Sequence, residues 1–226
     1  MPIFFQQDID ADTRLAIWKI EEDEEFFLQH VPLQRAITHP HKRLQHLAGR
    51  YLLQYLFADF PINLIKIADT RKPFLEDEAY HFSISHCTDY AAAIVSKTRR
   101  VGVDVEIPSH KVEKIKHKFL HPEELARLQK TALVSSTSGN EDPLLPLSHD
   151  VLTRLTLLWS AKEAVFKWWS YGNVDFSEMI RLQYDERQNT GYMDGSFIAD
   201  KHYPLRLQYK IFDGLCLAWI ANDLRQ

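Results

Sequence analysis

The segment GVDVE carries two carboxylates, Asp104 and Glu106, separated by one valine. Successive side chains of a β-strand point to opposite faces, so on a strand both carboxylates would share one face. Two carboxylates on one face repel each other unless a cation lies between them, and Mg²⁺ is the simplest such cation. A solvent-exposed strand edge explains the same spacing, because D-x-E is a short and common pattern. The spacing alone leaves both interpretations open.

A second group of polar residues lies in the segment WSAKEAVFKW. On a helix, Glu163 and Lys167 are one turn apart and lie on the same side as Trp159. An intrahelical ion pair, which contributes only ~0.3–0.5 kcal/mol, is the simplest explanation of this spacing. However, this helix is apolar nearly all round, which predicts burial, and a buried carboxylate needs a partner. Glu163 is therefore a candidate for a third acidic ligand or a general base.

The elements that carry these residues lack a regular βαβ alternation, which favours an α+β fold. The patterns predict strands at 13–20, 80–85, 90–96, 101–107, 178–184, 192–198, 205–212 and 215–220. They predict an amphipathic helix at 41–58, a short helix from Pro122 and a strong helix at 151–171 that ends at Gly172. The strands from 80 to 107 are expected to form an antiparallel meander, and 134–149 a long loop.

Both halves of the chain contain a long helix and a group of strands. We therefore expect two similar lobes, 1–108 and 109–226, related by a pseudo-twofold axis with the active site between them. No internal repeat at the level of residues supports this expectation.

Composition limits the class of protein. The 226 residues include 27 Lys and Arg against 31 Asp and Glu, a net charge of −4 that argues against nucleic acid as the main partner. Two cysteines, Cys87 and Cys216, do not make a disulfide framework. No signal peptide and no run of 18 apolar residues is present, so we expect a cytoplasmic protein without a membrane partner.

Ordered motifs from His41 to Gly172 resemble the 4'-phosphopantetheinyl transferases, specifically the surfactin-synthetase-activating type with broad carrier-protein specificity. The motifs are KR…GRYLL, RKPFL, FSISH, GVDVE, KFLHPEE and WSAKEAVFK. GVDVE followed by WSAKE is far more specific than either motif alone. The chain departs from the family at Arg71, which replaces the glycine of the usual Gly-Lys-Pro, so a backbone with positive φ must be lost or rebuilt there.

The resemblance implies a role for each matching position. Asp104, Glu106 and Glu163 would bind Mg²⁺ with the pyrophosphate of coenzyme A, and Glu163 or a water would deprotonate the acceptor serine. Lys167 would contact phosphate, and Lys162 is a weaker candidate for the same role. Glu124 ranks lower as a base. The 3'-phosphoadenosine end would be bound by residues Arg43, Arg50, Lys72, Ser85 and His86.

The implied enzyme is a holo-[acyl-carrier-protein] synthase that works as a monomer. It would transfer the 4'-phosphopantetheine arm of coenzyme A to a serine of an apo acyl or peptidyl carrier protein and release 3',5'-ADP. A Mg²⁺-dependent nuclease or phosphodiesterase, and a non-catalytic module that binds carrier protein or coenzyme A, are the alternatives. The sequence leaves open the particular carrier and the preference between Mg²⁺ and Mn²⁺.

Overall fold

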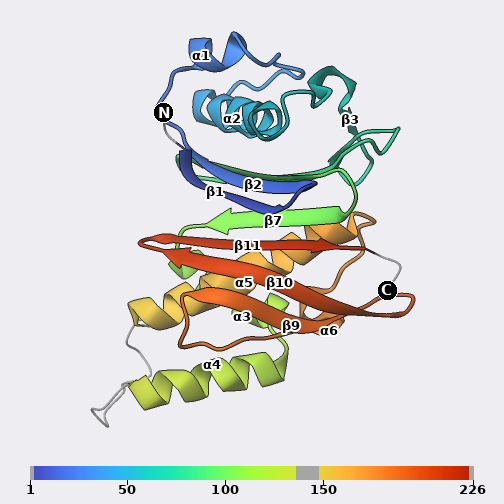
Figure 1. The fold of residues 1–226 in the computed structure, drawn as a ribbon. Coiled ribbons are helices and arrows are strands. Elements are labelled where there is room, and N and C mark those ends of the chain that lie inside the picture. The colour runs from blue at the N-terminus through green and yellow to red at the C-terminus, as the bar shows by residue number, and fades with distance from the viewer. Residues whose placement is uncertain (1–2, 136–147, 224–226) are drawn as a thin grey trace. The chain divides into compact units, whose positions relative to one another are not determined.

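The computed structural model describes residues 3–135 and 148–223 of the chain (Figure 1). Its helices are α1 (Glu24–Leu28), α2 (Pro40–Leu56), α3 (His110–Phe119), α4 (Pro122–Ser135), α5 (His149–Trp169) and α6 (Phe176–Met179), and a 3-10 turn, η1, spans Ile62–Leu64. Its strands are β1 (Ile3–Asp10), β2 (Thr13–Lys19), β3 (Lys66–Ile67), β4 (Pro73–Phe74), β5 (His81–Cys87), β6 (Tyr90–Ser96), β7 (Arg100–Glu106), β8 (Ile180–Gln183), β9 (Thr190–Ile198), β10 (His202–Phe212) and β11 (Leu215–Asn222).

Antiparallel sheets combined with helices confirm the predicted α+β class. The strand orders are β1-β2-β6-β5, β7-β11-β10-β9-β8 and β3-β4. In the described ranges, no helix has both the length and the apolar character needed to cross a membrane.

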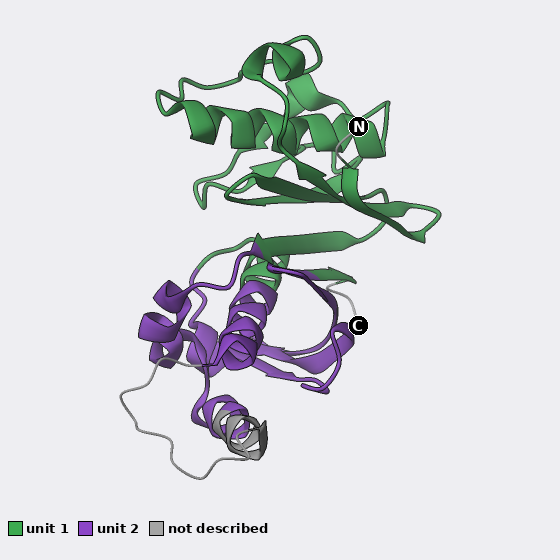
Figure 2. Ribbon diagram, turned by 90° about the vertical axis from the view of Figure 1, so that its left-hand side faces the viewer, with its two compact units in different colours: residues 1–105, 163–172, 219–225 green, residues 106–162, 173–218, 226 purple. Residues whose placement is uncertain are grey.

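The chain divides into two compact units (Figure 2). Unit 1 comprises residues 1–105, 163–172 and 219–225, and unit 2 comprises 106–162, 173–218 and 226. The division inside α5 therefore falls between Lys162 and Glu163. The lobes 1–108 and 109–226 and their pseudo-twofold relation stay predictions.

In unit 1, α2 packs against β2, β5 and β6 of the four-stranded sheet (Figure 1). The apolar residues of α2 recur at helical spacing, so Leu47 and Leu52 are fully buried in the core with Trp18 and Ala93 of the sheet. Pro40 at the first turn has no amide hydrogen to leave unpaired, which suits the start of a helix. The predicted helix at 41–58 is confirmed with small shifts at its ends.

The predicted meander was correct for two strands and wrong for the third. β5 and β6 form an antiparallel pair in which Ser85 lies opposite Ala92. β7 instead neighbours β11 in another sheet. β7 contacts β5 through serine side chains, because the Val103 amide donates to Ser83 Oγ at 3.2 Å. Polar side chains thus link β7 to β5 where the pattern predicted a backbone ladder.

Other boundaries also differ from the sequence predictions. β1 and α1 were not predicted. Residues 178–179 belong to α6 rather than to a strand, because the Asp175 side chain accepts hydrogen bonds from the amides of Ser177 and Glu178 and caps the helix. Most of the predicted loop at 134–149 lies outside the described residues; its ends belong to α4 and α5.

Unit 2 contains the antiparallel strands β8, β9 and β10. Alternate residues of β10 are buried, so Leu205, Leu207 and Tyr209 share one face as the period of a strand requires. β10 and β11 are joined by a turn in which Gly214 has a φ of 75° that favours glycine.

A close approach of α5 to β7 positions the acidic residues within unit 1. A Cβ atom on Gly102 would lie 2.0 Å from the Ala164 carbonyl oxygen and 2.8 Å from the Trp168 backbone nitrogen. Only glycine therefore lets the helix backbone come this near to the strand. Asp104 follows two residues later on the same strand face, so its carboxylate points toward the helix.

We expect Gly102→Ala to lower the free energy of unfolding by about 1–3 kcal/mol, because the new methyl group meets helix backbone that cannot rotate away. Gly49→Ala is the matched control and should lower the free energy of unfolding less. Its Cβ would first meet a side-chain methyl, Ile84 Cγ2, at 2.6 Å, and not helix backbone. Urea unfolding of both variants measures the difference. A Gly102→Ala midpoint equal to that of the wild type would contradict the close contact.

Candidate active site

Asp104 is the central acidic group of unit 1. Its carboxylate is buried, with 3% of the residue exposed. Oδ1 accepts hydrogen bonds from Ser85 Oγ at 2.6 Å and from Lys167 Nζ at 2.7 Å. Oδ2 is also buried, and no group in the described residues donates to it. One oxygen is therefore satisfied by protein, while the other retains its capacity to bind a cation or a donor.

Glu163 lies near Asp104 and Lys167, on the turn of α5 before Lys167. Burial and the negative charge of Asp104 raise the pKa of Glu163 to about 7, although the Lys167 ammonium opposes them. A carboxylate with this pKa holds or releases a proton close to neutral pH, which suits a general base.

Asp104 and Glu163 together offer carboxylate oxygens to a metal ion. In residues 3–135 and 148–223, no group of three or more His, Cys, Asp or Glu side chains is arranged to hold one. However, Asp104 raises the pKa of Glu163, and Asp104 Oδ2 is a buried acceptor without a donor. Two neighbouring carboxylates with an open oxygen fit a hard divalent cation such as Mg²⁺. Glu106, the third predicted ligand, is half-buried at the end of β7.

Basic side chains gather around α2 and the end of β5, and they belong to residues Arg35, His46, Arg50 and His86. Arg50 is buried and donates to Gln34 Oε1 at 3.0 Å and to His46 Nδ1 at 3.1 Å. Burial and the Arg35 charge lower the pKa of Arg50 to about 10. Close packing and then the Lys167 charge lower the pKa of His86. The two arginines provide positive charge that an anion can compensate, whereas the lowered pKa values keep His46 and His86 neutral near pH 7.

Lys72 lies against the end of α5. Its Nζ donates to the Lys167 carbonyl at 2.5 Å and to Ser170 Oγ. The preceding Arg71 has a φ of 65°, so the left-handed backbone usual for glycine is rebuilt here with an arginine. A cavity of about 230 Å³ lies beside this turn and is lined by Lys72, Ser83 and Lys167 among others.

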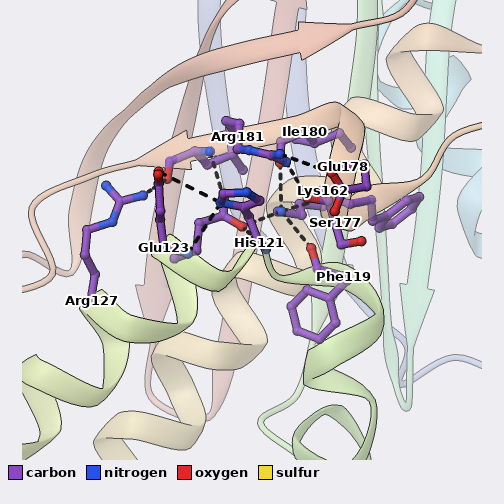
Figure 3. Close-up of polar contacts among 12 residues, drawn as sticks. Phe119, His121, Glu123, Arg127, Lys162, Ser177, Glu178, Ile180 and Arg181 are labelled. Carbon is purple, nitrogen blue, oxygen red and sulfur yellow. Dashed lines mark hydrogen bonds and ion pairs between the residues drawn. The ribbon is translucent and has the colours of Figure 1, made fainter.

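Two predicted phosphate-binding residues lie in other surroundings. Arg43 forms an ion pair with Glu24 of α1. Lys162 is fully buried in unit 2, where Figure 3 shows its ammonium among acceptors. Its Nζ lies 2.6 Å from Glu124 Oε2, and it donates to the carbonyls of Phe119, Phe176 and Ile180 at 2.7, 3.0 and 2.9 Å. Lys162 therefore has no donor left for a phosphate.

The Lys162–Glu124 pair links segments of unit 2. Glu124 Oε2 also accepts from the His121 amide at 2.9 Å, and Oε1 accepts from the Leu182 amide at 2.8 Å. Burial lowers the pKa of Lys162 to about 8, against the raising effect of Glu124. The pair thus joins α4, α5 and β8, and both Glu124 oxygens accept hydrogen bonds in this structural role.

The structure therefore brings together Asp104, Glu163, Lys167, Ser85 and His86, and it places Lys162, Glu124 and Arg43 elsewhere. Sequence reasoning did not select Arg35, Arg100, Gly102 or Ser170. The pattern GVDVE contained the glycine, but only the contact with α5 gives it a reason. Arg35 and Arg100 are single cations without a motif, so no local signal could identify them.

Comparison with known proteins agrees with this site. The family described as the 4'-phosphopantetheinyl transferase superfamily matches residues 100–219, which include β7, α5 and both candidate acids. This match covers more than half of the chain. The protein belongs to the 4'-phosphopantetheinyl transferase superfamily.

Curated relatives support the same family. Enterobactin synthase component D of Salmonella typhi is 31% identical over 129 residues, which is 56% of this chain and 47% of the relative. The protein of the same name from Escherichia coli O157:H7 is 30% identical over 129 residues, 56% of this chain and 54% of the relative. The chain thus spans about half the length of the curated relatives it matches.

We expect Lys162→Met to destabilise the protein by about 3–5 kcal/mol, because it leaves the Glu124 carboxylate buried without its partner charge. The double variant Lys162→Met/Glu124→Gln should recover part of this loss, since no buried charge then remains. Arg187→Met, which breaks an exposed pair with Asp185, is the control and should change stability by less than about 1 kcal/mol. Denaturant unfolding distinguishes these cases, and a Lys162→Met loss as small as that of the control would contradict the structural role.

His46 predicts a pH dependence. Burial and then the Arg50, Arg35 and His86 charges lower its pKa to about 3 from the usual 6.5. A lowered histidine pKa means that the unfolded chain binds more protons than the folded chain. The contribution of neutral His46 to the free energy of unfolding is therefore complete above pH 6.5 and is lost as pH falls toward 3. We expect His46→Gln to flatten the fall in unfolding free energy over this range by roughly 1–3 kcal/mol. A His46→Gln profile equal to that of the wild type would refute the assignment.

Proposed function

We propose that this protein transfers the 4'-phosphopantetheine arm of coenzyme A to a serine hydroxyl of an apo acyl or peptidyl carrier protein. The observation that carries the proposal is the arrangement of Asp104, Glu163 and Lys167 where α5 approaches β7. A buried carboxylate paired to a lysine beside a second carboxylate of raised pKa is suited to phosphate chemistry, which depends on charge neutralisation and positioning.

The residues divide the work as follows. Asp104, Glu106 and Glu163 would hold Mg²⁺, which neutralises pyrophosphate charge when bound. Lys167, His86 and Arg50 would bind the phosphate groups, and Lys72 lies beside Lys167, since its Nζ donates to the Lys167 carbonyl. Ser85 acts through Asp104, because its hydroxyl holds Oδ1 in place.

In the transfer step, the serine oxygen forms a bond to the β-phosphorus of coenzyme A, and the bond from that phosphorus to the bridging oxygen breaks. The leaving group is 3',5'-ADP. Glu163 would accept the serine proton directly or through a water. We also propose that the protein is of the surfactin-synthetase-activating type and has holo-[acyl-carrier-protein] synthase activity. It would be a cytoplasmic monomer that binds coenzyme A between two pseudo-twofold lobes.

The test incubates the protein with Mg²⁺, coenzyme A and a purified apo carrier protein and measures the carrier by intact mass. We expect a gain of one phosphopantetheine arm. Asp104→Asn and Glu163→Gln should lower the rate at least about 100-fold, because each removes charge from the reacting centre.

The exposed Glu76→Gln, which breaks the pair with Lys66, is the matched acidic control and should retain the wild-type rate. Unfolding curves of all three variants separate loss of activity from loss of fold. No mass gain on several unrelated carriers would refute the transferase, and DNA cleavage without carrier modification would indicate a nuclease.

A further inference from the structure

Lys72 has an unusual environment for a lysine near the surface. Within the described residues its ammonium contacts no carboxylate. Its two hydrogen-bond acceptors are the Lys167 carbonyl and the Ser170 hydroxyl, both neutral. The Ser170 hydroxyl donates onward to the Lys167 and Trp168 carbonyls, each at 3.0 Å, so it accepts from Lys72.

The number of acceptors matches the neutral amine. An ammonium has three N–H donors, whereas an amine has two and a free lone pair. The two protein acceptors around Nζ therefore suffice for the amine, whereas the ammonium would need a third acceptor from solvent or a ligand in the cavity. Burial, then the positive charges of Arg100 and Lys167, lower the pKa of Lys72 to about 7.

A cavity of about 400 Å³ opens beside Lys72, within the ~300–1,000 Å³ of small-molecule sites. Its walls include the aromatic rings of Phe74, Tyr80 and Phe82. Arg100, in the same wall, donates to Tyr171 Oη at 2.7 Å and lies over the Tyr171 ring, 4.9 Å from its centroid. The acidic wall residues, Asp69 and Glu78, are both exposed to water.

We propose that this cavity is a covalent capture site in which the Lys72 amine forms an imine with an aromatic aldehyde that carries an anionic group. The aromatic walls would stack on the ring, and the Arg100 guanidinium would pair with the anion. A desolvated lysine beside other cations is an activated nucleophile toward carbonyl compounds. The inference concerns the chemistry of one side chain and does not depend on the proposed transferase activity.

The reaction balances without a further reactant. The amine nitrogen forms a bond to the carbonyl carbon, and the carbonyl oxygen leaves as water with the two amine protons. Borohydride then donates a hydride to the imine carbon and makes the link permanent for analysis.

The experiment treats the full chain with pyridoxal 5'-phosphate at pH 7.5, adds borohydride, and maps labelled peptides by mass. We expect Lys72 to be labelled at least about tenfold faster than Lys66, whose side chain forms an exposed pair with Glu76 at 2.6 Å, because the lowered pKa of Lys72 leaves more of its amine free to attack the aldehyde. This comparison is made within the wild-type protein, so it needs no variant to fold.

Lys162 is an internal control. Burial lowers its pKa too, but it is fully buried among four acceptors and lines neither of the two cavities described above. Cavity access therefore predicts a label on Lys72 and none on Lys162. Equal labelling of Lys72 and Lys66, or a label mainly on other lysines, would overturn the proposal.

Variants and a second probe test recognition. Lys72→Arg should lose the fast label and Lys66→Arg should keep it. Arg100→Gln should slow labelling by pyridoxal 5'-phosphate several-fold, and benzaldehyde, which lacks an anion, should label wild type and Arg100→Gln more equally. An Arg100→Gln rate equal to that of the wild type with the phosphate-bearing probe would exclude Arg100 from the site.

Discussion

The candidate site depends on the close contact between Gly102 of β7 and the backbone of α5 around Ala164. Because no side chain separates strand from helix, Asp104 reaches the turn of α5 that carries Lys167. The same contact explains why two acids share one environment, since Asp104 raises the pKa of Glu163. A missing methyl group thus fixes the geometry on which charge, metal affinity and proton transfer would depend.

Consecutive residues of α5 have different tasks. Lys162 points into unit 2 and is saturated by Glu124 and three carbonyls, whereas Glu163 lies with Asp104 and Lys167 in unit 1. Each residue of a helix is rotated by about 100° from the one before, so neighbours in the sequence meet different surroundings. The lysine stabilises the fold, and the glutamate retains a protonation equilibrium near neutral pH. The motif WSAKE therefore contains both a residue that stabilises the fold and a candidate catalytic residue, and the motif itself does not distinguish them.

Sequence reasoning succeeded where a local pattern has a single physical meaning. The amphipathic period predicted α2, and the D-x-E spacing predicted two acids on one strand face. It failed where partners come from distant segments. Ser83 and Ser85 of β5 contact β7 through side-chain hydrogen bonds, and β7 pairs with β11. The predicted three-stranded meander was therefore wrong for β7. The family resemblance made Lys162 a candidate for phosphate binding, but no sequence rule specifies that Glu124 and three carbonyls already surround it.

The sequence by itself determined the α+β class and the long apolar helix, because these follow from periodicity and residue type, and the family resemblance of its motifs selected the candidate acids. The tertiary structure alone decided which groups meet. It paired Asp104 with Lys167 and Ser85, withdrew Lys162 and Glu124 into a buried ion pair, and set Lys72 between neutral acceptors and cations. The physical reason is that charge and reactivity depend on burial and on partners far away in the chain, which spacing along one segment does not encode.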